Sequence, residues 1–324
     1  MQKYSVALCT YNGSPYVRKQ LESIINQTVK PSQIIISDDG STDNTIDIVK
    51  QILEETSIDY SIVYNVSSHG VSQNFRNAFS YCVNPIIFCS DQDDVWDEKK
   101  AEIMLRKYDD NPKAMLVFSD GFLVDKNLNS LGGSVWDSVG ITNKRLIEGD
   151  WFHYLIKNCL ITGAAMSFKK ELINDMVLIP KEWLHDGWLT WVALSRNGLI
   201  PCNSKLFYYR QHNNNVIGMQ PKTNYFGRII GWRKNFSDVK NTRRIRHDRY
   251  LSLFKILGDK FNSKQRKEIK NCIFFWQDMI ESESMSIIKS FFIYTKHLAN
   301  GNYSNYYNGF RGYLRDVILL FHKV

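Results

Sequence analysis

Residues 6–45 read VALCTYNGSPYVRKQLESIINQTVKPSQIIISDDGSTDNT, and this stretch decides the fold. Short β-rich runs alternate here with helical patterns: residues 5–10 and 33–37 favour strands, whereas residues 16–27 and 45–55 favour helices. Because this strand–helix–strand order is typical of a sheet with mainly parallel strands, we predict an α/β fold in which helices flank the sheet.

The alternation continues to about residue 119, with strand patterns at 86–90 and 115–119. Residues 120–160 have weaker periodicity, and we expect loops that pack over the sheet. From about residue 222 the chain changes to long helical stretches rich in Arg, Lys and aromatic residues. We therefore predict an α/β domain over residues 1–220 and a helical C-terminal region over residues 221–324.

The charge of the chain is divided unevenly between these two parts. Residues 1–220 carry 21 Lys and Arg against 25 Asp and Glu, whereas residues 221–324 carry 20 against 8. A basic region of this kind favours an anionic partner, either a membrane surface or a nucleic acid. The alternative is a basic helical face that is merely solvated.

Cysteine usage and the absence of export signals favour a cytosolic protein. No C-x-x-C pair occurs, so we expect reduced core cysteines and no zinc site. The N-terminus lacks the pattern of a secretory signal, and no run approaches the roughly 18 to 20 apolar residues that would span a bilayer. The six cysteines are Cys9, Cys82, Cys89, Cys159, Cys202 and Cys272.

Three polar clusters each follow a predicted strand, at residues 10–13, 38–41 and 90–94. In open α/β sheets, ligands bind beyond the carboxyl ends of the strands. The clusters should therefore converge on one site. Asp91 and Asp93 suit a hard divalent cation, because two carboxylates can hold Mg²⁺ or Mn²⁺ and leave positions open for phosphate oxygens.

Each acidic pair has a simpler structural alternative. Asp94 or Asp97 can cap the helix that begins near residue 98, and for Asp97 we expect only that role. Asp38 and Asp39 can be turn formers in Asp-Asp-Gly-Ser. Adjacent to a diphosphate these two acids would repel it, so a better ligand for them is the N–H of a uracil or thymine, or a ribose hydroxyl.

Seven segments in order resemble family 2 glycosyltransferases of the GT-A fold, especially the bacterial rhamnosyltransferase-like branch. The similarity covers about residues 4–218, and the motifs are far more specific together than singly. The segments are VALCTYNGSPYVRKQLESIINQT, IIISDDGSTDNT, GVSQNFRNAF, FCSDQDDVW, TGAAMSF, HDGWLTWVAL and YYRQHNNNVIG.

The resemblance implies a role for individual residues of this chain. In the nucleotide-sugar pocket, where Asp39 would bind the base, it places Thr10, Tyr11, Asn12, Asp38, Asp39, Asn74, Asp91 and Gln92. As ligands of Mn²⁺ or Mg²⁺ it implies Asp91, Asp93 and His212. On the acceptor side it implies Gly163, His185 and Trp188, with Asp186 as the catalytic base.

The case for Asp186 also rests on chemistry, because an acceptor hydroxyl needs a general base within hydrogen-bond reach. The alternative is an N-cap for the helical run over residues 188–196. Trp183, Trp188 and Trp191 could form a stacking platform for a sugar, although their helical spacing makes burial the commoner outcome for at least one.

These expectations combine into one activity: an inverting transfer of a sugar from a UDP- or dTDP-sugar to a hydroxyl of a lipid-linked glycan, in cell-surface polysaccharide synthesis. The Q-x-x-R-W motif of processive synthases is absent, which favours single additions. A sugar-1-phosphate nucleotidylyltransferase should instead open with a Gly-rich phosphate loop carrying Arg and Lys, which residues 10–14 do not provide. No RNP, KH or helix-turn-helix pattern appears, so we expect no nucleic-acid partner.

The helical C-terminal region has an amphipathic candidate at residues 285–298. We expect Ile287, Ile288, Phe291, Phe292 and Tyr294 to lie largely on one side of a helix. With the preceding basic residues, this side would dock on the inner face of the cytoplasmic membrane, where those residues hold the diphosphate of the acceptor. The alternatives are packing on the catalytic domain or on a second copy in a homodimer. The basic residues are Arg228, Arg233, Lys234, Lys240, Arg243, Arg244, Arg246 and Arg249.

Overall fold

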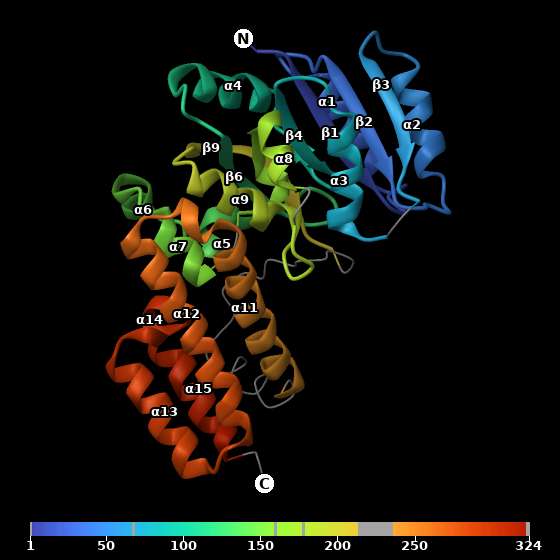
Figure 1. Ribbon diagram of the computed structural model, residues 1–324. Helices are drawn as coiled ribbons and strands as arrows, with labels where there is room; N and C mark the ends of the chain where they lie inside the picture. The colour runs from blue at the N-terminus through green and yellow to red at the C-terminus, as the bar shows by residue number, and fades with distance from the viewer. Residues whose placement is uncertain (1, 67–68, 159–160, 177–178, 213–235, 322–324) are drawn as a thin grey trace. The chain divides into compact units, whose positions relative to one another are not determined.

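The computed structural model describes residues 2–66, 69–158, 161–176, 179–212 and 236–321, and Figure 1 traces the chain. Two compact units are present, which we describe separately. The first unit contains the described residues within Met1–Ile147, Ile161–Ile179 and Leu184–Pro221. The second unit contains the described residues within Glu148–Leu160, Pro180–Trp183 and Lys222–Val324. The boundary predicted near residue 220 lies outside the described residues, and two short segments that precede it belong to the second unit.

One sheet organises the first unit, and its strand order is β3-β2-β1-β4-β8-β6-β9-β5, with β7 paired to β6. The strands are β1 (Tyr4–Thr10), β2 (Gln33–Asp38), β3 (Asp59–Tyr64), β4 (Ile86–Asp91), β5 (Val95–Trp96), β6 (Leu116–Val124), β7 (Ser130–Ser134), β8 (Met166–Lys169) and β9 (Leu199–Arg210).

Strands β3, β2, β1 and β4 run parallel, as do β6 and β9, whereas β8 joins the two groups by antiparallel pairing to β4 and β6. The predicted α/β fold with a mostly parallel sheet flanked by helices is therefore confirmed. The parallel register places Thr10 beside Asp38 on β2, and Cys9 beside Asp91 on β4. The carboxyl ends of these three strands thus meet at one edge of the sheet.

Helices cover both faces of this sheet, so β1 is buried along its whole length. The α-helices of the unit are α1 (Val17–Ile25), α2 (Thr45–Leu53), α3 (Val71–Tyr81), α4 (Lys100–Asp110), α5 (Val135–Val139), α6 (Asn143–Glu148), α8 (Ile173–Met176) and α9 (His185–Ser195). Short 3₁₀ turns form η1 (Gly163–Ala165) and η2 (Lys170–Leu172).

The hydrophobic core follows the two-residue period of the strands. Tyr4, Val6 and Leu8 of β1 join a cluster with apolar residues of α1, α2 and α4, while α3 packs on β1 and β2. The prediction of loops over residues 120–160 is wrong. That segment contains the end of β6, the strand β7 and the helices α5, α6 and α7 (Trp151–Asn158). Its apolar residues are buried by contacts distant in sequence rather than by a regular local pattern.

The described part of the second unit is helical, as predicted for the C-terminal region. Its elements are α7 (Trp151–Asn158), α11 (Phe236–Leu257), η3 (Gly258–Lys260), α12 (Ser263–Glu281), η4 (Ser282–Ser284), α13 (Ile287–Ala299), α14 (Asn302–Tyr306) and α15 (Gly309–Leu320). Figure 1 shows α11 to α15 in orange and red.

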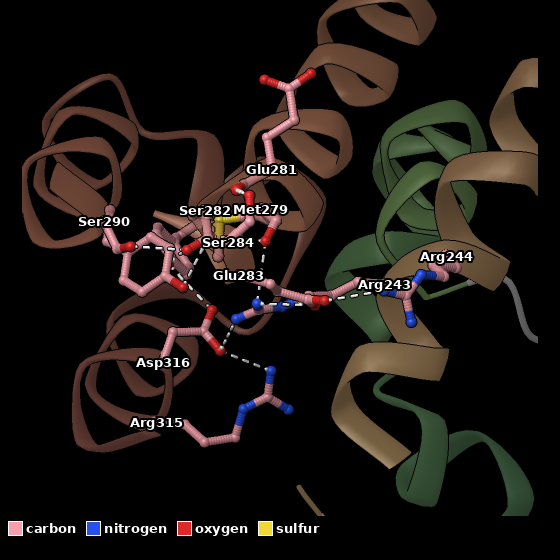
Figure 2. A network of polar contacts seen from close by, with 12 residues as sticks. Arg243, Arg244, Met279, Glu281, Ser282, Glu283, Ser284, Ser290, Arg315 and Asp316 are labelled. Carbon is pink, nitrogen blue, oxygen red and sulfur yellow. Dashed lines mark hydrogen bonds and ion pairs between the residues drawn. The ribbon is translucent and has the colours of Figure 1, made fainter. Parts of the chain in front are cut away.

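A buried polar network joins the helices of this second unit (Figure 2). The guanidinium of Arg243 lies 3.1 Å from Asp316 and 3.3 Å from Glu283, and it donates to the carbonyl of Met279 at 3.0 Å. Arg244 pairs with the same Glu283 at 3.1 Å. Since buried charges require partners, this network fixes how α11, α12 and α15 pack.

The cationic surface expected before residue 250 is corrected in part, because three of its arginines make contacts within the unit whereas the side chain of Arg244 is 55% exposed. Arg243 is buried, Arg246 donates to the carbonyl of Lys157, and Arg249 donates to the carbonyl of Glu182. These arginines stabilise the unit itself, so we do not assign a lipid diphosphate to them. Arg228, Arg233 and Lys234 lie outside the described residues.

The amphipathic prediction for α13 also needs correction. Tyr294 is buried, whereas Ile288, Phe291 and Phe292 are exposed, so these side chains do not share one packed side. Five of the six cysteines are buried and free, as expected, and Cys159 lies outside the described residues. Among the described helices, none combines the length and the apolar character needed to cross a membrane.

Candidate active site

The loops that follow β1, β2 and β4 are hydrogen-bonded to one another, so the three polar clusters converge. The amide of Asp39 donates to the carbonyl of Thr10 at 2.9 Å, and the amide of Asn12 donates to the Ser41 hydroxyl at 2.9 Å. The amide of Tyr11 donates to the side-chain oxygen of Gln92 at 2.9 Å. Parallel pairing of the strands brings these loops together, since each begins at the same edge of the sheet.

Gln92 fixes the first loop through both ends of its side-chain amide. Its nitrogen donates back to the carbonyl of Tyr11 at 2.9 Å. Gly13 is required for this approach, because a Cβ there would lie 2.0 Å from the Gln92 side-chain oxygen. Asn12 adopts φ of 46°, and its side-chain oxygen accepts from the amide of Thr42 at 2.8 Å. Tyr11 is left exposed beside this loop.

Asp38 and Asn74, both predicted to contact the nucleotide, form hydrogen bonds with other residues of the protein. Buried Asp38 accepts hydrogen bonds from the hydroxyls of Thr10 and Ser41 and from the amides of Gly40 and Ser41. Buried Asn74 accepts from the Ser37 hydroxyl and donates to the carbonyl of Thr10. Both side chains therefore position strand ends, in agreement with the turn-forming alternative for Asp38.

Asp39 is also held by the protein, though with different partners. Its carboxylate accepts from the side-chain amide of Asn65 at 2.7 Å and from the amide of Gly70 at 2.7 Å. The ring of His69 lies 3.1 Å from the same carboxylate. A carboxylate offers about four acceptor positions, so capacity for one ligand donor remains. The sequence did not identify Asn65, His69 or Gly70 as site residues. The one feature that could have indicated them is that Gly70 begins a family-like motif and the other two precede it closely.

Asp91 ends β4, and no described residue donates a hydrogen bond to its carboxylate. Burial, together with the carboxylates of Asp93 and Asp186, raises the pKa of Asp91 to about 7, while the cation of Lys100 partly opposes the rise. The pKa of Asp91 rises because three carboxylates lie close together where little water reaches them, which disfavours the charged form. A bound cation would relieve this repulsion.

The carboxylate of Asp93, in the same loop, lies 2.8 Å from the ring of His212. His212 stacks on Tyr16 with ring centroids 4.8 Å apart, and Arg210 donates to the carbonyl of Asp93 at 2.6 Å. The end of β9 thus holds the acidic loop in place. The remainder of the segment predicted to close the site, from residue 213, lies outside the described residues.

The donor set suits a divalent cation. Asp91 and Asp93 supply carboxylate oxygens and His212 an imidazole, which are ligands that Mn²⁺ accepts, and Mg²⁺ accepts the oxygens. Within the described ranges, no three His, Cys, Asp or Glu side chains are already gathered as a metal cage. The unpartnered carboxylate of Asp91 is nevertheless what a cation would need, so the residues present fit it.

Lys100 lies beneath these carboxylates, and the sequence did not single it out. Its ammonium donates to the carbonyl of Ala164 at 2.6 Å and lies 4.4 Å from the centre of the Trp96 ring. Burial lowers the pKa of Lys100 to about 7, although Asp94, Cys89 and Asp91 oppose the shift. Only burial distinguishes this lysine from an ordinary one in the first turn of a helix, and burial is not visible in one sequence.

Asp186 is the second residue of α9. Its carboxylate accepts from the amide of Gly163 at 3.2 Å and from the amide of Gly187 at 2.6 Å. The N-cap of α9 is Leu184, so Asp186 does not occupy the capping position. Its charge also raises the pKa of Asp91, which places the two carboxylates within electrostatic reach.

His185 supports Asp186 from the interior. Its ring is 3% exposed and stacks on Phe75 at 4.0 Å, and a Cβ on Gly163 would lie 2.9 Å from it. Neither ring nitrogen has a partner among the described residues. His185 and Gly163 therefore act through packing and not by touching an acceptor.

Trp188 is corrected, because its indole is fully buried and donates to the carbonyl of Asp175 at 3.2 Å. A ring without exposed surface cannot stack on a sugar. Trp191 is equally buried, and Trp183 belongs to the second unit, where it donates to the carbonyl of Arg249. The three tryptophans thus form no stacking platform in this unit.

Burial of His185 predicts a pH effect on stability. Burial lowers its pKa, and the carboxylate of Asp186 opposes this only in part. As the pH falls through about 6.5, this histidine takes up a proton in the unfolded chain at a higher pH than in the folded protein. The contribution of His185 to stability is therefore retained above that pH and decreases below it. When the pH is lowered from 7.5 to 5.5, we expect the free energy of unfolding to decrease less in His185→Phe than in the native protein. Urea denaturation at the two pH values measures both decreases.

A matched control for this experiment is His153→Phe, because the side chain of His153 is 44% exposed. It should follow the native protein across the same pH range. An unchanged loss in His185→Phe would show that this ring is not kept neutral by burial.

Comparison with known proteins gives three findings. The family model described as "Glycosyl transferase family 2" matches residues 5–171. The dTDP-rhamnosyl transferase RfbG of Shigella flexneri is 30% identical over 228 residues, which cover 65% of this chain and 73% of that protein. The putative teichuronic acid biosynthesis glycosyltransferase TuaG of Bacillus subtilis is 24% identical over 220 residues, covering 65% of this chain and 80% of that protein.

Among solved structures, S. aureus TarS in complex with UDP-GlcNAc is similar, with a TM-score of 0.57 and 13% identity. The similarity covers 85% of this chain and 72% of that one. At this identity the likeness concerns the fold alone.

Proposed function

Because the chain belongs to glycosyl transferase family 2, we propose that it transfers a sugar from a UDP- or dTDP-sugar to a hydroxyl of a lipid-linked glycan, with inversion at the anomeric carbon. The observation that carries this proposal is the convergence of Asp91, Asp93 and Asp186 beyond the ends of parallel strands, with Asp186 oriented by the amide of Gly163. The product would enter polysaccharide synthesis at the cell surface.

The reaction is a direct displacement. Asp186 accepts the proton of the acceptor hydroxyl while the hydroxyl oxygen forms a bond to the anomeric carbon, and the bond from that carbon to the nucleoside diphosphate breaks. Attack from the face opposite the leaving group inverts the configuration. The Gly163 and Gly187 amides hold the carboxylate of Asp186 in one orientation, so less freedom is lost on reaching the reactive geometry.

A divalent cation, Mn²⁺ or Mg²⁺, would be held by Asp91, Asp93 and His212. When bound, it supplies positive charge that stabilises the departing diphosphate. The protein supplies the remainder of this environment. Arg210 and Tyr16 position His212 and the acidic loop, and Lys100, when protonated, opposes the rise in the pKa of Asp91.

Several observations support the nature of the donor. RfbG, which is 30% identical to this chain over 228 residues, is described as a dTDP-rhamnosyl transferase. Asp39, which retains capacity for a donor N–H, is the group proposed to bind the base. Nucleotide-sugar hydrolysis across a panel of UDP- and dTDP-sugars in the presence of Mn²⁺ tests the proposal, which fails if no member of the panel is turned over.

Asp39→Ala is expected to weaken UDP or dTDP binding by about 1–3 kcal/mol, the usual cost of losing a hydrogen bond to a charged group. Isothermal titration calorimetry with the free nucleotide measures this directly. Asp59→Ala is a suitable control, since Asp59 is an exposed acid at the start of β3. Equal affinity for all three proteins would remove Asp39 from the binding site.

The proposed place of action is the cytoplasmic face of the membrane, where a lipid-linked acceptor and a cytosolic nucleotide sugar meet. The charge of the C-terminal region supports this placement, because the segment 221–324 carries a large excess of basic residues.

A further inference from the structure

Helix α13 exposes three large apolar side chains to solvent and buries three polar or amphipathic ones. Ser290, Tyr294 and His297 are buried, whereas Ile288 is 70% exposed and Phe292 is 69% exposed. Spacings of three and four residues place each set on its own face of the helix. Amphipathic helices of globular proteins ordinarily have the reverse arrangement.

The inward face of α13 is fixed by specific polar contacts. The hydroxyls of Tyr294 and Ser282 lie 2.9 Å apart, the Ser290 hydroxyl donates to the carbonyl of Ser282 at 2.8 Å, and the ring of His297 lies 2.9 Å from Asp278. Figure 2 shows Ser290 and Ser282 within this network. A rotation of α13 that hid its phenylalanines would break all of these bonds, so the apolar face stays outward.

Two lysines flank this apolar face. Lys289 and Lys296 are exposed and lie one helical turn from Phe292 on either side. Asp316 is the only acidic residue from residue 287 to residue 321, and it is buried against Arg243 and Arg315. The exposed surface of this segment therefore carries positive charge without any negative charge of its own.

Aromatic surface continues onto the neighbouring helix. α15 packs against α13, where the hydroxyl of Tyr313 lies 3.3 Å from that of Thr295. Phe310 stacks on Tyr313 and is 59% exposed. Exposed apolar residues that gather in this way mark a binding surface.

We propose that the outward face of α13, formed by Ile288, Lys289, Phe291, Phe292 and Lys296, docks on an anionic lipid surface. The phenylalanines and the isoleucine enter the boundary between headgroups and acyl chains, and the lysines contact anionic headgroups. This inference rests on the proposed function for the lipid-linked acceptor, and it moves the docking surface from the arginines of α11 to α13.

The charges favour a lipid over a second copy of the chain. A twofold interface pairs the same patch with itself, so it would bring the lysines of two copies together around the apolar centre. No exposed acid within this segment could neutralise them. Anionic headgroups neutralise them directly.

Cosedimentation of the full chain with vesicles tests this surface. Vesicles of phosphatidylcholine with phosphatidylglycerol should bind the protein at low salt, whereas pure phosphatidylcholine should bind it far less. Ile288→Ser with Phe292→Ser should lower the partition coefficient by roughly tenfold or more. Lys289→Glu with Lys296→Glu should lower it by roughly 25-fold or more, since each basic residue near such a surface changes affinity about fivefold.

The matched control is Ile147→Ser, which removes an exposed isoleucine of α6 in the other unit and should bind as the native chain does. Nucleotide-sugar hydrolysis without vesicles should be equal in all four proteins, so loss of docking is distinguished from loss of the proposed activity. Equal vesicle binding by the double variants and the native chain would overturn the proposal. The proposal would also be overturned if the native chain were a dimer that did not bind anionic vesicles and that became monomeric with the Ile288 and Phe292 substitutions.

Discussion

Replacing Asp186 by Asn should lower turnover by roughly 10²-fold or more while nucleotide binding stays unchanged, the usual scale of losing a general base. Asn has nearly the size and shape of Asp, and its one amide oxygen can still accept from one of the two amides, of Gly163 or Gly187, that now donate to different carboxylate oxygens of Asp186. The side chain therefore fits the same place and the fold is retained. What it cannot do is take the proton of an acceptor hydroxyl. Steady-state transfer to an acceptor glycan and calorimetry with the nucleotide separate these two effects.

Asp47→Asn is the matched control for Asp186. Asp47 also lies in the first turn of a helix, α2, but on its exposed surface. Both substitutions remove a negative charge near a helix N-terminus, which is worth about 0.3–1 kcal/mol of stability. If Asp186→Asn turned over like Asp47→Asn, Asp186 would be reassigned as a residue that stabilises the start of α9.

Removal of the divalent cation should abolish transfer, and so should Asp93→Ala. The carboxylates of Asp91, Asp93 and Asp186 repel one another and also repel a diphosphate, so without a cation the donor has no stable place beside them. We expect a decrease of about 10³-fold or more, which corresponds to several kcal/mol of charge stabilisation. Transfer assays in EDTA, followed by addition of Mn²⁺ or Mg²⁺, measure the dependence.

Asp97→Ala serves as the control in the same loop. Its carboxylate accepts from the amide of Lys99, the N-cap of α4, so the loss of this hydrogen bond should cost about 0.5–1.5 kcal/mol of stability and leave the response to EDTA unchanged. Circular dichroism should show intact secondary structure in both variants. Full activity of the native protein in excess EDTA would exclude the cation from the reaction.

Much of the fold could be predicted because its determinants are local. The alternation of strand and helix periods indicated a mostly parallel sheet, and the polar residues after β1, β2 and β4 indicated the edge at which they meet. Each of these features depends on residues that are close together in the sequence, so the pattern of the sequence indicates them without knowledge of tertiary contacts. The capping role predicted for Asp97 is wrong, because the N-cap of α4 is Lys99, whose amide donates to the carboxylate of Asp97.

The partners of individual site residues could not be predicted in this way. Asp38 and Asp39 are adjacent and chemically identical, yet one is filled by four protein donors and the other keeps capacity for a ligand. Lys100 became part of the site only because α4 buries it against the carbonyl of Ala164, 64 residues away. These differences arise from contacts distant in sequence.

The sequence by itself indicated the alternation of strands and helices before residue 120, the family-like motifs and the basic excess of the C-terminal region. The tertiary structure alone decided which face of each helix is buried. In α13 Ser290 and Tyr294 are buried in hydroxyl contacts while Phe291 and Phe292 stay exposed, and in α9 packing encloses Trp188 completely. Periodicity reports that a helix has two faces, but which face is covered depends on the elements that pack against it.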